Sequence, residues 1–177
     1  MSQNINAAIF GGNVALSSAG VTGLSGAATT FSTGATAVTY AIGGKLLSKA
    51  QVSGAASPTT DVLTGAAFKA IGKNQGCAFV FTLDASGNYG VAQGPLPVQA
   101  GTTGAPTNVD DSGNWTAAPQ FPAIPDTLTP VAYTLIRGQS TLAAAGFIYG
   151  TSNWNATGVV ITTPQNVMAL PATPQTA

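Results

Sequence analysis

Short runs of β-branched and aromatic residues, each ended by turn-forming residues, recur along most of this sequence. The clearest run covers residues 76–83 and is followed by a turn at 84–88 and a second run at 89–93. Similar runs occupy residues 36–42, 131–137 and 158–162. β-branched and aromatic residues favour strands, and Asp, Gly and Asn permit tight turns between them. The pattern predicts an all-β fold, a single-domain β-sandwich or β-barrel (jelly-roll-like).

One segment departs from this pattern. Residues 61–71 are the best candidate for a helix in the chain. Gly65 lies within the segment and disfavours a helix, so an extended conformation stays open as the alternative.

The two ends of the chain differ in composition from its middle. Residues 1–28 are rich in Gly, Ala and Ser and have little capacity to form a core of their own. We predict an extended N-terminal arm over residues 1–28, lying along a neighbouring subunit or a partner surface. Residues 29–170 form the predicted β-sandwich domain, and residues 171–177 a C-terminal tail. The first basic residue is Lys45 and no apolar stretch reaches the ~20 residues of a membrane span, so we expect neither a secretory signal nor a membrane partner.

Charged residues are scarce. Five Lys and Arg and five Asp and Glu make up 6% of 177 residues and give zero net charge, against roughly 25% charged residues in ordinary globular proteins. The absence of His removes the commonest metal ligand and general base. Five scattered cations do not build the phosphate-neutralising face that nucleic-acid binding requires. We therefore expect no enzyme activity, no cofactor and no nucleic-acid partner.

The few residues that could carry chemistry have plainer interpretations. Cys77 opens an apolar strand, and without a His to activate it we interpret it as a buried small hydrophobe. Residues 110–114 lack the alternating ligands and closing Glu of a calcium loop and are interpreted as a solvated turn. Asp84 and Asp126 also lie in turn sequences, and nothing brings them together as a catalytic pair. No catalytic, cofactor-binding or metal-binding residue is predicted.

Both tryptophans lie beside Asn in polar loops. An exposed aromatic on a loop is a candidate contact for a partner protein or a glycan. The alternative is that the indole folds back and closes one end of the sandwich. We favour that alternative for Trp115, and neither reading is preferred for Trp154. The candidate partner-contact residues are therefore Trp154, Asn153, Asn155 and Trp115.

Several runs between about residues 29 and 160 resemble small structural proteins of tailed bacteriophage virions. They are YAIGGK at 40–45, PTTD at 58–61, TGAAF at 64–68, the hairpin from FVF at 79–81 through DASG at 84–87 to VAQG at 91–94, FPAIPD at 121–126, and FIYGTSNWNATG at 147–158. The last run is the most distinctive. The resemblance carries no catalytic residues to this chain.

The resemblance implies a head decoration (cement) protein, β-rich and homotrimeric, bound to the lattice of the major capsid protein on the outer surface of the head. Its alternative is a short head or tail fibre that binds host-surface glycans. A nearly uncharged surface agrees with the first expectation, because such a surface tends to associate with other protein. A protein of this kind is made in the bacterial cytoplasm and functions in the virion without an enzymatic reaction.

Overall fold

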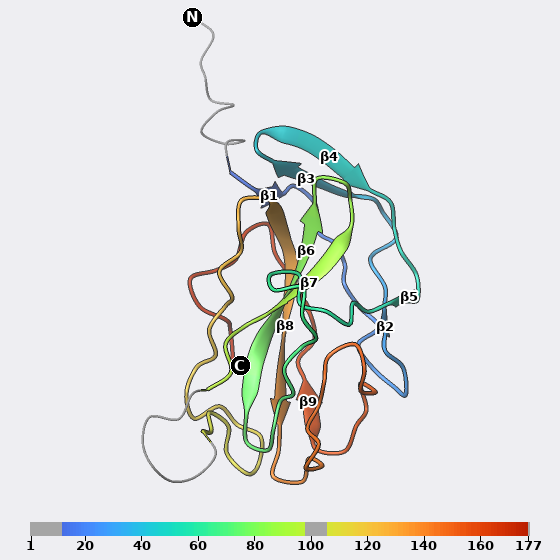
Figure 1. Ribbon diagram of the computed structural model, residues 1–177. Helices are drawn as coiled ribbons and strands as arrows, with labels where there is room; N and C mark the ends of the chain where they lie inside the picture. The colour runs from blue at the N-terminus through green and yellow to red at the C-terminus, as the bar shows by residue number, and fades with distance from the viewer. Residues whose placement is uncertain (1–11, 98–105, 177) are drawn as a thin grey trace, which may run out of the picture.

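The computed structural model describes residues 12–97 and 106–176, and within these ranges every regular element is a β-strand. The all-β prediction is confirmed. The largest sheet contains β6 (Gly76–Asp84), β7 (Tyr89–Gln93), β8 (Leu128–Gly138), β9 (Val159–Ile161) and β10 (Gln165–Asn166). A second sheet contains β1 (Val14–Ala15), β3 (Val38–Ile42) and β4 (Lys45–Lys49), and β2 (Thr30–Phe31) pairs with β5 (Ala55–Ala56). In Figure 1 the β3–β4 hairpin lies at one end of the molecule, beyond the long strands β6 and β8.

The antiparallel pair β6–β8 is the centre of the large sheet, whose order is β10-β8-β6-β7. β6 and β8 are buried along almost their whole length, on both faces of the sheet. One face, with Phe79 and Phe81, packs into the main core that also includes Tyr40 of the second sheet. The opposite face, with Val80 and Leu135, lies under loop and C-terminal residues. This two-sided burial explains why residues 76–83 are apolar at consecutive positions instead of alternating with polar ones.

A proline lies inside the central strand β8. Pro130 has no N–H to donate to a neighbouring strand, so this position normally disfavours a central strand. The β6–β8 register shifts between Phe81 and Thr82, and Val131 has no direct partner there. The irregularity accommodates Pro130 while both strands continue on either side of it.

β9 and β10 follow one another along the same edge of β8. Thr162 bridges them, because its N–H donates to the Leu135 carbonyl and its hydroxyl accepts from the Leu135 N–H. Pro164 then interrupts the pairing before β10 resumes it at Gln165. The predicted run at 158–162 is therefore the first half of one interrupted edge strand.

The expectation of an N-terminal arm over residues 1–28 is not supported. Val14 and Ala15 pair with β3, and Ala15, Ala19 and Val21 are buried in the main core of the same chain. The Val21 N–H donates to Asn166 Oδ1 at 2.9 Å. Small side chains allow this segment to pack closely within the domain, which composition alone did not indicate. Residues 1–11 of the expected arm lie outside the described residues.

The helix expected at residues 61–71 is also absent, and the alternative of an extended segment does not hold for its first part, which forms a turn. Asp61 begins a turn in which its Oδ1 accepts from the Leu63 N–H and its carbonyl accepts from the Gly65 N–H. Gly65 has a φ of 69°, a left-handed conformation that ends any helical continuation. A short Asx-type turn therefore replaces the helix.

Two glycines with positive φ test how closely the loops pack. A Cβ added to Gly150 (φ 71°) would overlap the Pro58 carbonyl oxygen, whereas one added to Gly65 (φ 69°) would meet nothing within 4 Å. We expect Gly65→Ala to lower the free energy of unfolding by about 1–2 kcal/mol and Gly150→Ala by about 3 kcal/mol or more. Chemical denaturation of both variants measures the difference. Equal losses would show that the loop holding Gly150 does not pack against Pro58.

Candidate functional site

Trp154 is not a surface contact. Its side chain is 3% exposed and packs edge-on against Tyr149 at 5.1 Å between ring centroids. Its Nε1–H donates to the Thr30 carbonyl at 3.0 Å. Of the two readings left open for Trp154, the burial of its side chain favours the one in which the indole folds back, because it covers the aromatic core beneath it.

Asn153 and Asn155, on either side of Trp154, are exposed. The Trp154 N–H donates to the Ala28 carbonyl and the Asn155 N–H to the Gly26 carbonyl. These bonds fix the loop against the N-terminal part of the chain. Only the two amide side chains of this group remain accessible to a partner.

Trp115 lies half-buried on the opposite face of the large sheet from the main core. Its six-membered ring covers Gly76 so closely that a Cβ there would collide with it. The Arg137 guanidinium carbon lies 5.9 Å from the ring centroid, within range of a cation–π contact. Trp115 folds back as in the favoured reading, but it covers a face of the large sheet and does not close one end of a sandwich.

The acidic residues mainly hold turns. The sequence contains D-x-S-G-N twice, at residues 84–88 and 110–114, and each copy is followed by an aromatic residue. In both copies Asp Oδ1 accepts the N–H groups of the Ser and the Asn, and Oδ2 accepts from the Asn side chain, all at 2.7–3.0 Å. The Gly has φ 79° in the first copy and 89° in the second. The repeated motif was visible in the sequence, but its role as an identical hydrogen-bonded turn was not recognised there.

These bonds change the acidity of both carboxyl groups. Burial opposes ionisation of Asp84, but the hydrogen bonds from Asn88, Ser86 and Gly87 outweigh burial and lower its pKa. Hydrogen bonds from Asn114 and Ser112 likewise lower the pKa of Asp110. The carboxylates are thus already engaged by their own turns. Within residues 12–97 and 106–176, no three metal-ligating side chains gather to hold an ion.

Cys77 is fully buried in β6, as expected for a small core residue. Burial raises the pKa of its thiol to about 12, and a hydrogen bond from Gln93 only partly offsets this. The thiolate that nucleophilic chemistry needs is therefore absent at neutral pH.

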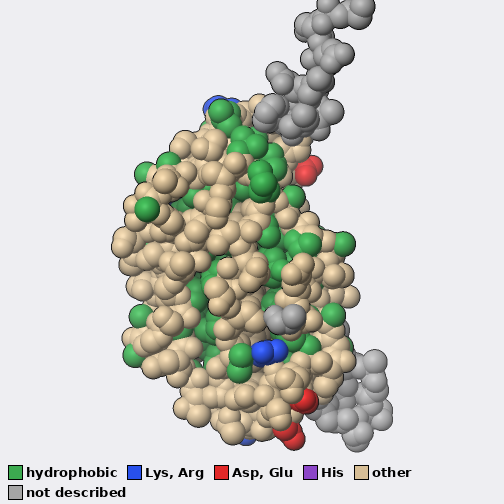
Figure 2. All heavy atoms as spheres, turned by 180° about the vertical axis from the view of Figure 1, so that it is seen from behind, with side chains coloured by type: hydrophobic (Ala, Val, Ile, Leu, Met, Phe, Trp, Pro, Cys, Tyr) green, Lys and Arg blue, Asp and Glu red, His purple; other side chains and the backbone are tan. Residues whose placement is uncertain are grey.

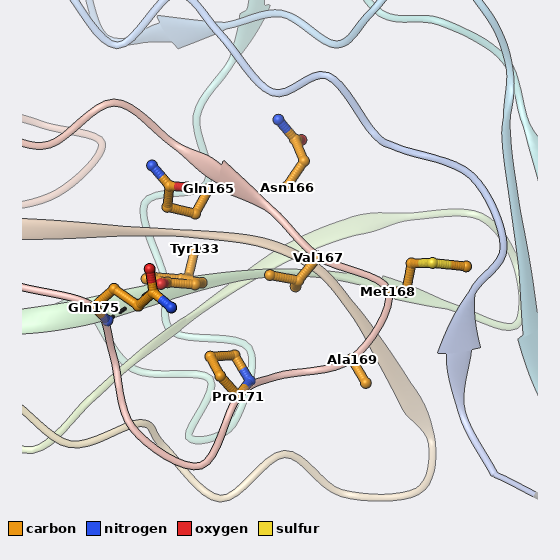
Figure 3. Close-up of a pocket in the computed structure, with 8 residues that line it drawn as sticks. All are labelled: Tyr133, Gln165, Asn166, Val167, Met168, Ala169, Pro171 and Gln175. Carbon is orange, nitrogen blue, oxygen red and sulfur yellow. Dashed lines mark hydrogen bonds between the residues drawn. The ribbon is translucent and has the colours of Figure 1, made fainter.

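The C-terminal segment forms a shallow groove of about 330 Å³ with Tyr133. Figure 3 shows residues 165–175 passing over Tyr133, with Met168 pointing away from it. The Gln175 N–H donates to the Tyr133 hydroxyl at 3.3 Å, so the predicted tail at 171–177 contacts the domain as far as Gln175. No charged side chain lines this C-terminal groove; its polar groups are the amides of Gln165, Asn166 and Gln175.

The remaining surface is close to neutral. Figure 2 shows a few separate Lys, Arg and Asp side chains on a face that is otherwise uncharged. Three large hydrophobic side chains are exposed in the described ranges: Leu46 (63%), Met168 (56%) and Val62 (37%). Leu46 belongs to β4, at the rim of the second sheet. Among the described residues no helix is long and apolar enough to span a membrane.

Comparison with known proteins identifies no relative: no family model, curated protein or solved structure matches this chain.

The two D-x-S-G-N turns make the stability of the folded protein depend on pH in the acid range. Lowered pKa values in the folded state mean that the stabilisation from Asp84 and Asp110 is complete above about pH 4, where unfolded Asp ionises, and is lost as the pH falls through the folded values. We expect the urea midpoint to fall between pH 5 and pH 2. The double variant Asp84→Asn/Asp110→Asn should flatten that decline. A decline as steep in the double variant as in the wild type would contradict this role of the two turns.

Cys77 makes the stability of the protein depend on pH in the alkaline range, in the opposite direction. Its raised folded pKa means that its stabilisation is present below about pH 8.5, where the unfolded thiol stays protonated, and is lost as the pH rises toward 12. We expect Cys77→Ala to weaken the fall in the urea midpoint between pH 8 and pH 9.5, before tyrosines ionise. At pH 8.5 the native thiol should react with an aromatic disulfide reagent only as fast as the protein unfolds. Rapid labelling of the folded protein would contradict its burial.

Proposed function

We propose that this protein is a non-enzymatic virion structural protein, a capsid decoration or cement subunit that binds the assembled head lattice of a tailed bacteriophage and stabilises it. The proposal includes a homotrimer bound to the major capsid protein on the outer surface of the head. The resemblance of residues 29–160 to small virion proteins supports this class of function.

The observation that carries the proposal is that most acidic side chains, and the single thiol, are engaged inside the protein. Asp61, Asp84 and Asp110 accept hydrogen bonds from their own turns, and the single thiol is buried. What remains exposed is an almost neutral surface with isolated apolar side chains. Such a surface suits a broad contact determined by area and shape, because it offers few charges for steering a small ionic ligand.

Binding of this kind stabilises a lattice by mass action. A protein that binds the assembled lattice and not the separated subunits shifts the equilibrium toward assembly. Packaged DNA pushes the capsid subunits apart, so a subunit bound across their junctions opposes that force. No chemical step is required of the protein.

The short fibre remains the second candidate, and the C-terminal groove is the observation in its favour. Amide side chains beside a tyrosine can exchange hydrogen bonds with sugar hydroxyls without any charge. Burial of Trp154 removes one of the aromatic contacts that first suggested glycan binding.

Particles that lack the protein provide the test. We expect them to assemble but to release DNA at a lower temperature than complete particles, and purified protein should restore the original temperature. If the protein is a decoration subunit, we also expect each complete particle to contain hundreds of copies of it. Particles that keep their heat resistance but no longer adsorb to cells, and that normally carry a few dozen copies or fewer, would replace the decoration role with the fibre role.

A further inference from the structure

The strand β4 has an unpaired edge. The second sheet has the order β1-β3-β4, so β4 pairs with β3 on one side and with no strand of the described ranges on the other. In Figure 1 β4 lies along the rim at the end of the molecule. Leu46, the second residue of β4, is 63% exposed. An exposed edge of this kind is a template for pairing with another strand.

The hairpin geometry determines which backbone groups of β4 face outward. Gly43 and Gly44 both have positive φ (55° and 78°), as in a two-residue type I′ turn, so the closing pair Ile42–Lys45 is hydrogen-bonded. Alternation then directs the N–H and C=O groups of Leu46 and Ser48 away from β3.

Thr39, the residue opposite Ser48, agrees with this assignment. Its N–H donates to Ser17 Oγ and its carbonyl accepts from the Leu16 N–H, on the side of β3 away from β4. The backbone groups of Ser48 therefore face the open edge.

The side chains on this edge carry a charge pattern. Residues 45, 47 and 49 lie on one face of the strand and residues 46 and 48 on the other. Lys45 and Lys49 are the only charged residues among the first 60 of the chain. Lys45 is exposed; Lys49 is half-buried, with its Nζ 5.9 Å from the centre of the Tyr89 ring. One face of the edge thus presents two positive charges separated by an apolar residue.

We propose that β4 binds an extended strand of a partner protein that carries two carboxylates four residues apart. The partner strand adds to the second sheet through the outward groups of Leu46 and Ser48, and its carboxylates lie beside Lys45 and Lys49. An apolar residue between them packs beside Leu47. This inference rests on the proposed function, and in that setting the strand belongs to the capsid protein.

A second copy of this chain fits the same edge poorly in the register with the fullest overlap. Antiparallel pairing of two β4 strands about Leu47 aligns all five residues and places Lys45 of one copy opposite Lys49 of the other, twice. Like charges directly opposite one another destabilise a strand pair. In that register the lysines oppose self-pairing and favour an acidic strand, which is specificity by repulsion as well as attraction.

The test uses the purified full chain and two labelled peptides. The acidic peptide has the core glutamate-threonine-valine-valine-glutamate between threonines, and the basic peptide replaces both glutamates by lysine. Fluorescence anisotropy measures their binding to the wild type and to Lys45→Glu/Lys49→Glu. A matched control, Lys69→Glu/Lys73→Glu, reverses two exposed lysines with the same spacing on another part of the surface.

We expect the wild type and the control to bind the acidic peptide at least about tenfold more tightly than the basic one, and the β4 variant to reverse that order. Ser48→Pro removes an outward N–H without touching the β3 pairing and should weaken binding of both peptides. Failure of the acidic peptide to bind, or an equal change in the control variant, would overturn the proposal. So would a dimer of the wild type that Ser48→Pro dissociates, because β4 would then pair with a second copy.

Adding the same proteins to stripped particles separates this inference from the proposed function. Binding of the wild type together with loss of binding in Lys45→Glu/Lys49→Glu supports both. Equal binding of both proteins leaves the decoration role intact and overturns the role of β4. Peptide binding that follows the charge swap without any binding to particles overturns the decoration role alone.

Discussion

The antiparallel pairing of β6 with β8 is the interaction on which the rest of this structure depends. These two strands contribute to both hydrophobic clusters, so each face of the pair organises a different part of the chain. The second sheet packs against one face through Tyr40 and Val38. The loops carrying Trp115 and Phe121 and the C-terminal segment pack against the other. Loss of the pair would therefore remove the support for both layers at once.

Hydrogen-bonded turns compensate for the scarcity of ion pairs and of long regular elements. Asp84 and Asp110 each gather three donors in the same geometry, and Asn108 does the equivalent for Gly76, accepting from its N–H and donating to its carbonyl. Such bonds satisfy backbone groups that the short strands leave without partners. Three of the acidic side chains thus stabilise turns within the protein instead of forming ion pairs on its surface.

The surface left by this arrangement is neutral, and its most specific feature is an edge of a sheet. The C-terminal groove offers amides and the β4 edge offers backbone groups flanked by two lysines. Both suit recognition by shape and hydrogen bonding. The proposed role in a virion and the proposed acidic strand partner are both open to direct measurement.

The sequence by itself determined the class of fold and the strongest local elements. The hairpin at 76–93 was predictable because an apolar run, a D-x-S-G-N turn and a returning run are local signals, and β6 and β7 lie where they indicate. The burial of Cys77 followed from its place in that run. These features depend on contacts between residues that are near one another in the chain.

Only the tertiary structure decided the fate of Trp154, of residues 12–28 and of the C-terminal segment. Trp154 is buried because its indole N–H donates to the carbonyl of Thr30, 124 residues away in the sequence, and its ring packs against Tyr149. Val21 is held by Asn166 across 145 residues. The β4 edge is open because no described segment of the chain returns to pair with it. Such outcomes depend on which distant segments of the chain contact one another. Local patterns of neighbouring residues do not predict those contacts.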